Sequence, residues 1–222
     1  MIITREYIID SLTEIGFYDY YEIIIPPIDE AKLAALPRNW RDVLIAKKSI
    51  DDFLEQNWMA VNAILPRTIS LLKTKVKQIA IIEQAEGTLS SLLYLFTQNG
   101  SLRIRVGYQP INMLPEVFKT LSVDILPVYQ IHNGFIDLIS CDAGFLPTDK
   151  CEVFLGGESG NTGSFLKVFG VGPNSLGFDL ESKERDAFII WGSDEEIEPV
   201  DGFWAELDQW MAAGIDDFDD NT

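Results

Sequence analysis

The chain has 222 residues and a mass of 25.0 kDa, and its 47% hydrophobic and 23% charged residues are typical of a globular protein with one domain or two small ones. Its 17 Lys and Arg against 35 Asp and Glu give a net charge of −18. Because so acidic a surface repels phosphate, we expect neither nucleic acid nor an anionic membrane surface as a direct partner.

The acidic residues are concentrated in the second half of the chain. Residues 1–110 carry 12 basic and 13 acidic side chains, a net charge of −1, whereas residues 111–222 carry 5 and 22, a net charge of −17. We place a boundary near residues 107–111. It separates an additional N-terminal α+β region, which is an accessory region or a divergent module, from an acidic domain at 111–222.

The N-terminal region begins with helical patterns. Thr4 is placed to cap a helix that ends at Gly16, and residues 20–25 read as a strand that stops at two prolines. Apolar residues then recur at helical spacing over 51–75, where Pro66 divides the segment into two helices.

A strand at 77–83 and a hairpin follow. The hairpin joins 92–97 to 102–106 through Asn99-Gly100, a sequence that tolerates the positive φ angles of a tight turn. Arg103 and Arg105 share one face of the second strand. We expect this to be the solvated face of a half-buried sheet; the alternative is a basic binding site.

The C-terminal domain is predicted to open with one or two helices over 113–134, with Pro115 and Pro127 in their first turns. A last helix is expected to be capped by Asp201 and to carry Glu206 and Asp208 on its polar side. Between them, short β-rich runs separated by turn residues predict an antiparallel meander: 135–139, 151–155, 165–169, 176–180 and 187–191.

Few residues offer chemistry at neutral pH. His132 is the only histidine, and its place at a predicted helix end favours an interaction with the helix dipole over catalysis. Cys141 and Cys151 are expected to be free, buried thiols, and a disulfide between them remains the alternative. These three residues are too few for a typical zinc site, so we expect no metal and no cofactor.

Two glycine-rich stretches, 156–163 and 170–177, lack the features of phosphate-binding loops and are interpreted as hairpin loops. No acid–base pair stands out, so we expect a protein that is not an enzyme; a hydrolase that uses a carboxylate pair is the less favoured alternative. Neither a signal peptide nor an apolar run of membrane-spanning length is apparent, which predicts a cytoplasmic protein.

Five short motifs occur in order in the C-terminal half: LPVYQIHNGF (126–135), GFLP (144–147), SLGFDL (175–180), FIIW (188–191) and FWAELDQWM (203–211). Together they resemble the SMI1/KNR4 (SUKH) superfamily over residues 112–214. The resemblance implies an α+β fold, an antiparallel sheet flanked by helices, and no catalysis. Bacterial members are typically immunity proteins that neutralise a cognate toxin, and fungal members are scaffolds in cell-wall signalling.

Charge and resemblance together suggest a binding function. A toxin that processes nucleic acid must present Lys and Arg, and an acidic inhibitor is attracted to such a surface. The alternatives are a scaffold or regulatory protein, and an acidic surface that serves only solubility. The partner-binding candidates are Asp179, Glu181, Asp194, Glu195, Glu196 and Glu198.

Overall fold

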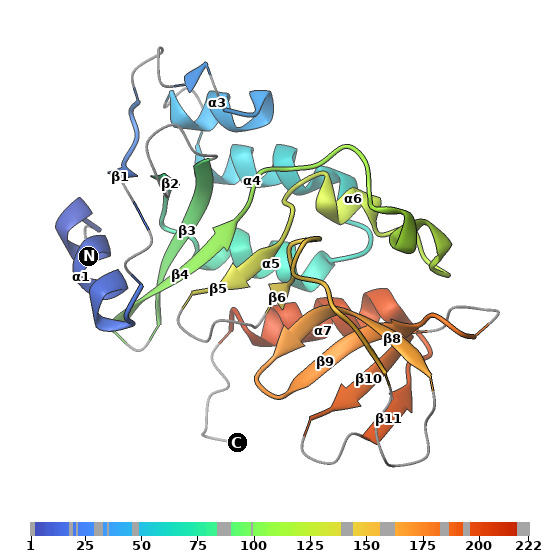
Figure 1. Cartoon of the computed structure of the whole chain (residues 1–222). Coiled ribbons are helices and arrows are strands. Elements are labelled where there is room, and N and C mark those ends of the chain that lie inside the picture. Colours follow the sequence, from blue (N-terminus) through green and yellow to red (C-terminus); the bar gives the residue numbers. More distant parts are fainter. Residues whose placement is uncertain are drawn as a thin grey trace.

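The computed structural model shows an α+β protein built on one antiparallel sheet (Figure 1). It describes residues 3–17, 20, 22–28, 33–34, 36–45, 49–83, 90–98, 100–138, 144–155, 163–182, 187–192 and 196–216. Candidate residues Cys141, Asp194 and Glu195, together with Asn99 of the predicted hairpin turn, lie outside these ranges. No described helix is long and apolar enough to cross a bilayer.

Within the described residues the sheet has eleven strands, and every pair of neighbours is antiparallel. The two halves of the chain join where β4 pairs with β5, with Val106 opposite Ile136. The spatial order is β1 (Glu22–Ile24), β2 (Gln78–Glu83), β3 (Ser90–Gln98), β4 (Ser101–Gly107), β5 (Phe135–Asp137), β6 (Gly144–Phe145), β8 (Ser164–Val171), β9 (Asn174–Asp179), β10 (Ala187–Trp191) and β11 (Glu196–Pro199), while β7 (Val153–Leu155) pairs with β8 off this path.

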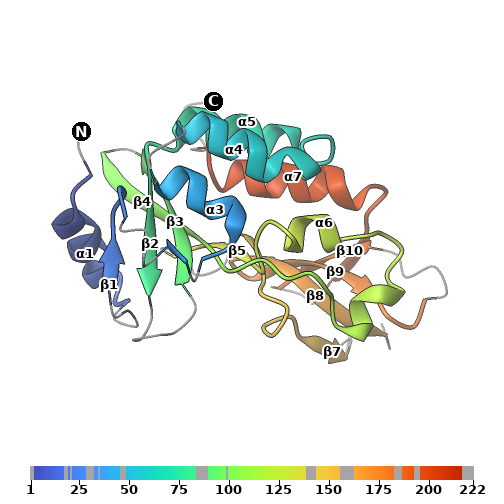
Figure 2. The ribbon, with the colours of Figure 1, turned by 90° about the horizontal axis from the view of Figure 1, so that it is seen from above.

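Helices lie on both faces of the sheet. One face carries a layer of α4 (Ile50–Trp58), α5 (Pro66–Lys75) and α7 (Phe203–Ala213), in which α7 packs on the C-terminal strands, so the last described helix lies beside helices from the first third of the chain (Figure 2). The opposite face of the early strands packs against α1 (Arg5–Glu14). The remaining helical segments are α3 (Arg38–Leu44), η1 (Met59–Val61), η2 (Glu116–Thr120) and α6 (Leu126–Tyr129).

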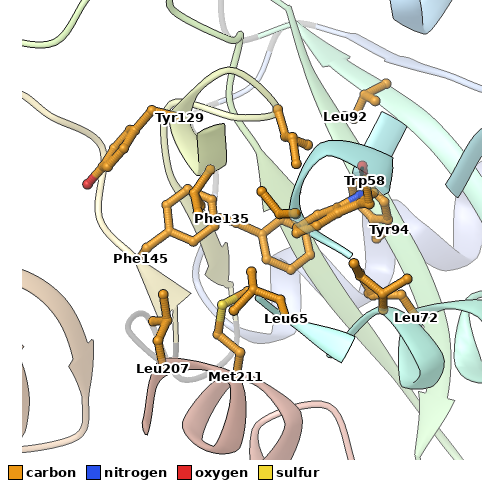
Figure 3. Packing of buried hydrophobic residues seen from close by; sticks show 14 of the residues in the cluster. Trp58, Leu65, Leu72, Leu92, Tyr94, Tyr129, Phe135, Phe145, Leu207 and Met211 are labelled. Atoms are coloured by element: carbon orange, nitrogen blue, oxygen red, sulfur yellow. Dashed lines mark hydrogen bonds between the residues drawn. The ribbon is translucent and has the colours of Figure 1, made fainter. Parts of the chain in front are cut away.

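Two hydrophobic clusters follow from this layering. The larger one lies between the sheet and the α4–α5–α7 layer and draws on both halves of the chain; Figure 3 shows Trp58 and Tyr94 beside Phe135, and Leu207 and Met211 of α7 near them. The smaller one lies between α1 and the first strands. Burial of apolar side chains on both faces explains why the sheet is continuous across the boundary between residues 1–110 and 111–222.

Local sequence signals account for many element boundaries. The Thr4 hydroxyl accepts a hydrogen bond from the Tyr7 N–H at 3.2 Å and begins α1, as predicted. Pro66 is the first residue of α5, where a missing N–H costs nothing. Gly100, with φ of +82°, turns the chain from β3 into β4.

Other expectations in the C-terminal half are corrected. The helices predicted over 113–134 are limited to the short segments η2 and α6, and neither β6 nor β11 was predicted. The N-cap of α7 is Gly202, with no side-chain cap, so Asp201 does not have the capping role expected for it. Asp208 is buried rather than on a solvated side of α7, because α5 covers it.

Candidate functional site

The described candidate carboxylates fall into two groups. Asp179 ends β9, and its Oδ1 accepts hydrogen bonds from the backbone N–H groups of Glu181 at 2.8 Å and Ser182 at 3.1 Å. Glu181 is exposed and accepts a hydrogen bond from the Ser164 hydroxyl at 2.9 Å. These contacts hold the chain as it leaves β9, so the Asp179 carboxylate has a local structural role.

The second group lies on β11. Glu196 and Glu198 are both exposed and, being two residues apart, share one face of the strand. They lie opposite Trp191 and Ile189 of β10, and the Glu198 carboxylate accepts a hydrogen bond from the Trp191 indole N–H at 3.1 Å. This contact anchors Glu198 while leaving Glu196 open to solvent.

The structure does not bring the two groups together. Ile189, opposite Glu198, belongs to the core under α7, as does Phe178, which precedes Asp179. Because side chains alternate along a strand, Asp179 lies on the face away from α7, whereas Glu196 and Glu198 lie on the α7 side. The two glutamates at the sheet edge therefore form the only pair of described candidates that share an exposed strand face.

The histidine expected at a helix end is buried completely. Its Nδ1 lies 3.1 Å from the Tyr108 carbonyl oxygen, which can only accept, so Nδ1 carries the proton and donates it. Its Nε2, 2.6 Å from the Tyr94 hydroxyl, then accepts a hydrogen bond from that group, which itself accepts one from the Trp58 indole N–H at 3.3 Å. Every polar atom of the imidazole is engaged.

Burial lowers the pKa of His132 to about 3, so the ring is neutral at physiological pH. The ring bonds a backbone carbonyl, as a structural role requires, but that carbonyl belongs to Tyr108 outside any helix, and the neutral ring has no charge to interact with a helix dipole. It packs instead among aromatic rings, with centroids 5.6 Å from Trp40 and 5.8 Å from both Trp58 and Phe135. These contacts give His132 a structural role.

A buried ionic cluster occupies the strand face that was expected to be solvated. Arg105 is fully buried; its guanidinium donates to the Gly214 carbonyl at 2.8 Å and lies 5.6 Å from the centre of the Phe135 ring. Arg103 pairs with the buried Asp137 carboxylate at 2.9 Å. Burial lowers the pKa of Arg105 to about 10, and the negative charge of Asp137 opposes that shift. The cluster joins β4 and β5 to the end of α7.

The sequence shows that arginines alternate with apolar residues along β4, but it does not show which segments cover the arginine face of the strand. Asp137 is 34 residues after Arg103, and Gly214 is 109 residues after Arg105. One signal in the sequence does point to this cluster: two arginines lie in a strand that is otherwise mostly apolar. An arginine in such a strand must either reach solvent or find an acidic partner. Neither arginine forms part of a basic binding surface.

The remaining candidates are structural as well. Cys151 is a free, half-buried thiol 3.6 Å from the Tyr129 hydroxyl, and burial raises its pKa to about 11, so it is protonated at neutral pH. The second glycine-rich stretch forms the β8–β9 hairpin, as predicted, with Gly172 at φ of +53°. Most of the first stretch lies outside the described residues, between the paired strands β7 and β8.

No group of three or more His, Cys, Asp or Glu side chains in the described part of the chain is placed to hold a metal ion. The exposed glutamate pair of β11 is thus the candidate site that the geometry favours, and its two carboxylates offer negative charge to a cationic group. Comparisons with models of protein families, with curated proteins and with solved structures find no match to this chain.

Proposed function

We propose that this chain is a non-catalytic protein-binding module of the SMI1/KNR4 type, an immunity protein that binds and neutralises a basic, nucleic-acid-processing toxin inside the producing cell. The observation that carries the proposal is the pair of exposed carboxylates, Glu196 and Glu198, on one face of the edge strand β11. They belong to the half of the chain whose net charge is −17.

The position of β11 favours docking through side chains. Among the described strands β11 pairs only with β10, so no described strand covers its other edge. The Val200 N–H bonds the Ala187 carbonyl at 3.0 Å, and by alternation Glu198 and Glu196 also direct their backbone groups to β10. The backbone groups on the outer edge of β11 then belong to Ile197 and Pro199. Pro199 has no N–H, so it cannot donate a hydrogen bond to an added strand.

A short edge strand with a proline and two negative charges resists the addition of another strand. The partner therefore contacts the glutamate side chains. Because these are negatively charged, the surface of the partner must carry Lys or Arg. The long-range field of an excess of 17 negative charges accelerates such an encounter by about 10- to 1000-fold at low salt. A toxin that binds the phosphates of nucleic acid has such a surface of Lys and Arg side chains.

The buried state of the titratable groups supports a binding role over catalysis. The imidazole of His132 is neutral and fully bonded, and the Cys151 thiol is protonated at neutral pH. Neither is poised to act as a base or a nucleophile. A neutralising protein needs no such group, because it acts by occupying the surface of its target.

We expect the neighbouring gene to encode a toxin, and the experiment co-expresses this chain with the domain of that toxin. The toxin domain alone should arrest growth, the full chain should restore it, and Glu196→Lys/Glu198→Lys should lose most of the protection. Asp10→Lys/Glu14→Lys on α1 makes the same charge change at exposed positions and should protect as well as the unaltered chain. A neighbouring metabolic operon, or full protection by the β11 variant, would contradict the proposal.

A further inference from the structure

Two tryptophan side chains meet at the C-terminal end of the sheet. Trp191, the last residue of β10, and Trp210 of α7 are both half-buried, and the centres of their rings lie 6.3 Å apart with the ring planes inclined by 51°. The Trp210 ring also packs against Phe169 of β8 at 5.7 Å between centres. The pair therefore rests on the larger hydrophobic cluster while part of each residue stays exposed.

The path of the chain explains why the two rings meet. From Glu196 to Pro199 the strand β11 advances by about 10 Å, and from Phe203 to Trp210 the helix α7 advances by about the same length. The chain turns between the two elements, and α7 lies on the face of the strands that carries the core (Figure 2). Trp210 is thereby brought level with Trp191, which pairs with Glu196.

Three carboxylates flank the tryptophan pair. Glu196 lies directly opposite Trp191, and Glu198 accepts the hydrogen bond from the Trp191 indole N–H at 3.1 Å. Glu206 is half-buried one turn before Trp210, on the same side of α7. Among the described residues, no Lys or Arg forms an ion pair with any of these carboxylates. We name these five residues the tryptophan–glutamate surface.

The chemistry of this surface distinguishes one cation from another. Every charge on it is negative, so the group that it complements is positive. An indole ring attracts a cation more strongly than the other aromatic side chains do, and a planar guanidinium can stack on it while its N–H groups donate to a carboxylate. The Trp191 indole bonds Oε2 of Glu198, which leaves Oε1 of that carboxylate to accept such a bond. A lysine ammonium has no plane with which to stack, so it matches the charge alone.

We propose that the tryptophan–glutamate surface binds an arginine side chain of the partner protein, with the guanidinium stacked on an indole ring and hydrogen-bonded to Glu196 or Glu198. The inference rests on the function proposed above and names the group that the glutamates of β11 recognise. Tryptophan and arginine are among the residues that most often dominate the binding energy of protein interfaces. This one arginine is therefore expected to contribute more to affinity than the other cations of the partner.

The test titrates the full chain with two blocked tripeptides of equal charge, Gly-Arg-Gly and Gly-Lys-Gly, at about 150 mM salt, where long-range attraction is screened. The chain has five tryptophans, and NMR resolves an indole N–H signal for each. The arginine peptide should shift the signals of Trp191 and Trp210 but not those of the buried Trp40 and Trp58. It should bind at least about threefold more tightly than the lysine peptide.

Variants separate the ring from the charge. Trp191→Leu should weaken binding of the arginine peptide about fivefold, whereas Trp204→Leu, at a half-buried tryptophan on the α5 side of α7, should leave it unchanged. Glu198→Gln keeps an oxygen that can accept the indole N–H but removes the negative charge, and it should also weaken binding about fivefold. This second variant tests the proposal if Trp191→Leu does not fold.

The proposal is overturned if the two peptides bind equally tightly, if the Trp191 and Trp210 signals do not move, or if Glu198→Gln binds the arginine peptide as tightly as the unaltered chain. Co-expression with the toxin domain separates this inference from the proposed function. A folded Trp191→Leu chain that still protects fully would overturn the inference and leave the proposed function standing. Arginine binding at this surface of a chain that protects against no toxin would support the inference and contradict the proposed function.

Discussion

Asp208 in α7 accepts a hydrogen bond from the backbone N–H of Thr68, 2.9 Å away and 140 residues earlier in the chain. Thr68 lies in the first turn of α5, where N–H groups lack partners within the helix, and Leu65, the N-cap residue, offers no side-chain acceptor. The last helix therefore supplies the cap that the local sequence of α5 lacks. The same contact joins α7 to the first turn of α5.

Replacing Asp208 by alanine should lower the free energy of unfolding by about 2 kcal/mol, because it removes two charge-assisted bonds, one to the buried N–H of Thr68 and one to the half-buried N–H of Arg67. Urea unfolding of the full chain measures this change. Asp201→Ala is the matched control: it removes an exposed aspartate that caps nothing and should alter stability by less than about 0.5 kcal/mol. Equal effects of the two variants would refute the capping role of Asp208.

The single histidine makes stability depend on pH. The pKa of His132 is about 3 in the folded chain against a usual 6.5, so between these values the unfolded chain binds a proton that the folded chain does not. Stability due to His132 is thus fully present above pH 6.5 and falls as the pH drops through this window.

Comparison with His132→Gln isolates this contribution from that of the carboxylates. Between pH 6 and pH 4 the unfolding free energy of the unaltered chain should fall relative to the variant by about 1.4 kcal/mol per pH unit. Urea unfolding at several pH values provides the curves. Parallel curves for the two proteins would show that the imidazole titrates normally and is not buried as described.

The buried ionic cluster should be sensitive to the loss of one partner. Arg105→Met removes a buried cation beside Asp137 and should destabilise the chain by about 3 kcal/mol or more, because an incompletely compensated charge stays in the core. Arg105→Met/Asp137→Asn should recover part of the loss. Arg38→Met, at an exposed position of α3, should change stability by less than about 0.5 kcal/mol. A double variant less stable than Arg105→Met would contradict this coupling.

Local patterns predicted those elements whose signals lie within the element itself. The cap at Thr4, the helix start at Pro66 and the turn at Gly100 each have a steric or hydrogen-bonding cause within four residues, and each is confirmed. In contrast, β6 has only two residues and β11 has the sequence EIEP. Strands this short or this acidic depend on a neighbouring strand, which periodicity does not show.

The misassigned residues share a cause. Arg105 and Asp208 were placed on solvated faces because each is polar on an amphipathic element, and each is buried by a segment more than 100 residues away in the chain. A polar side chain is usually exposed, but it can be buried where an element distant in the sequence supplies its hydrogen-bond or ionic partner. For the candidate site, the charge distribution indicates the acidic half of the chain. The strand pairing adds that Glu196 and Glu198 lie on one face of the sheet and Asp179 on the other, which the sequence does not show.

We propose above that the glutamates of β11 bind a basic partner. The measurement that tests this is the dissociation constant of the full chain for the domain of the toxin expected from the neighbouring gene, obtained by calorimetry at increasing salt. We expect the affinity to fall at least about tenfold between 50 and 500 mM salt, because added ions screen the charges, and Glu196→Lys/Glu198→Lys to flatten this dependence. If the affinity does not change with salt, or if the variant keeps the full salt dependence, the glutamates of β11 do not bind the partner through their charge.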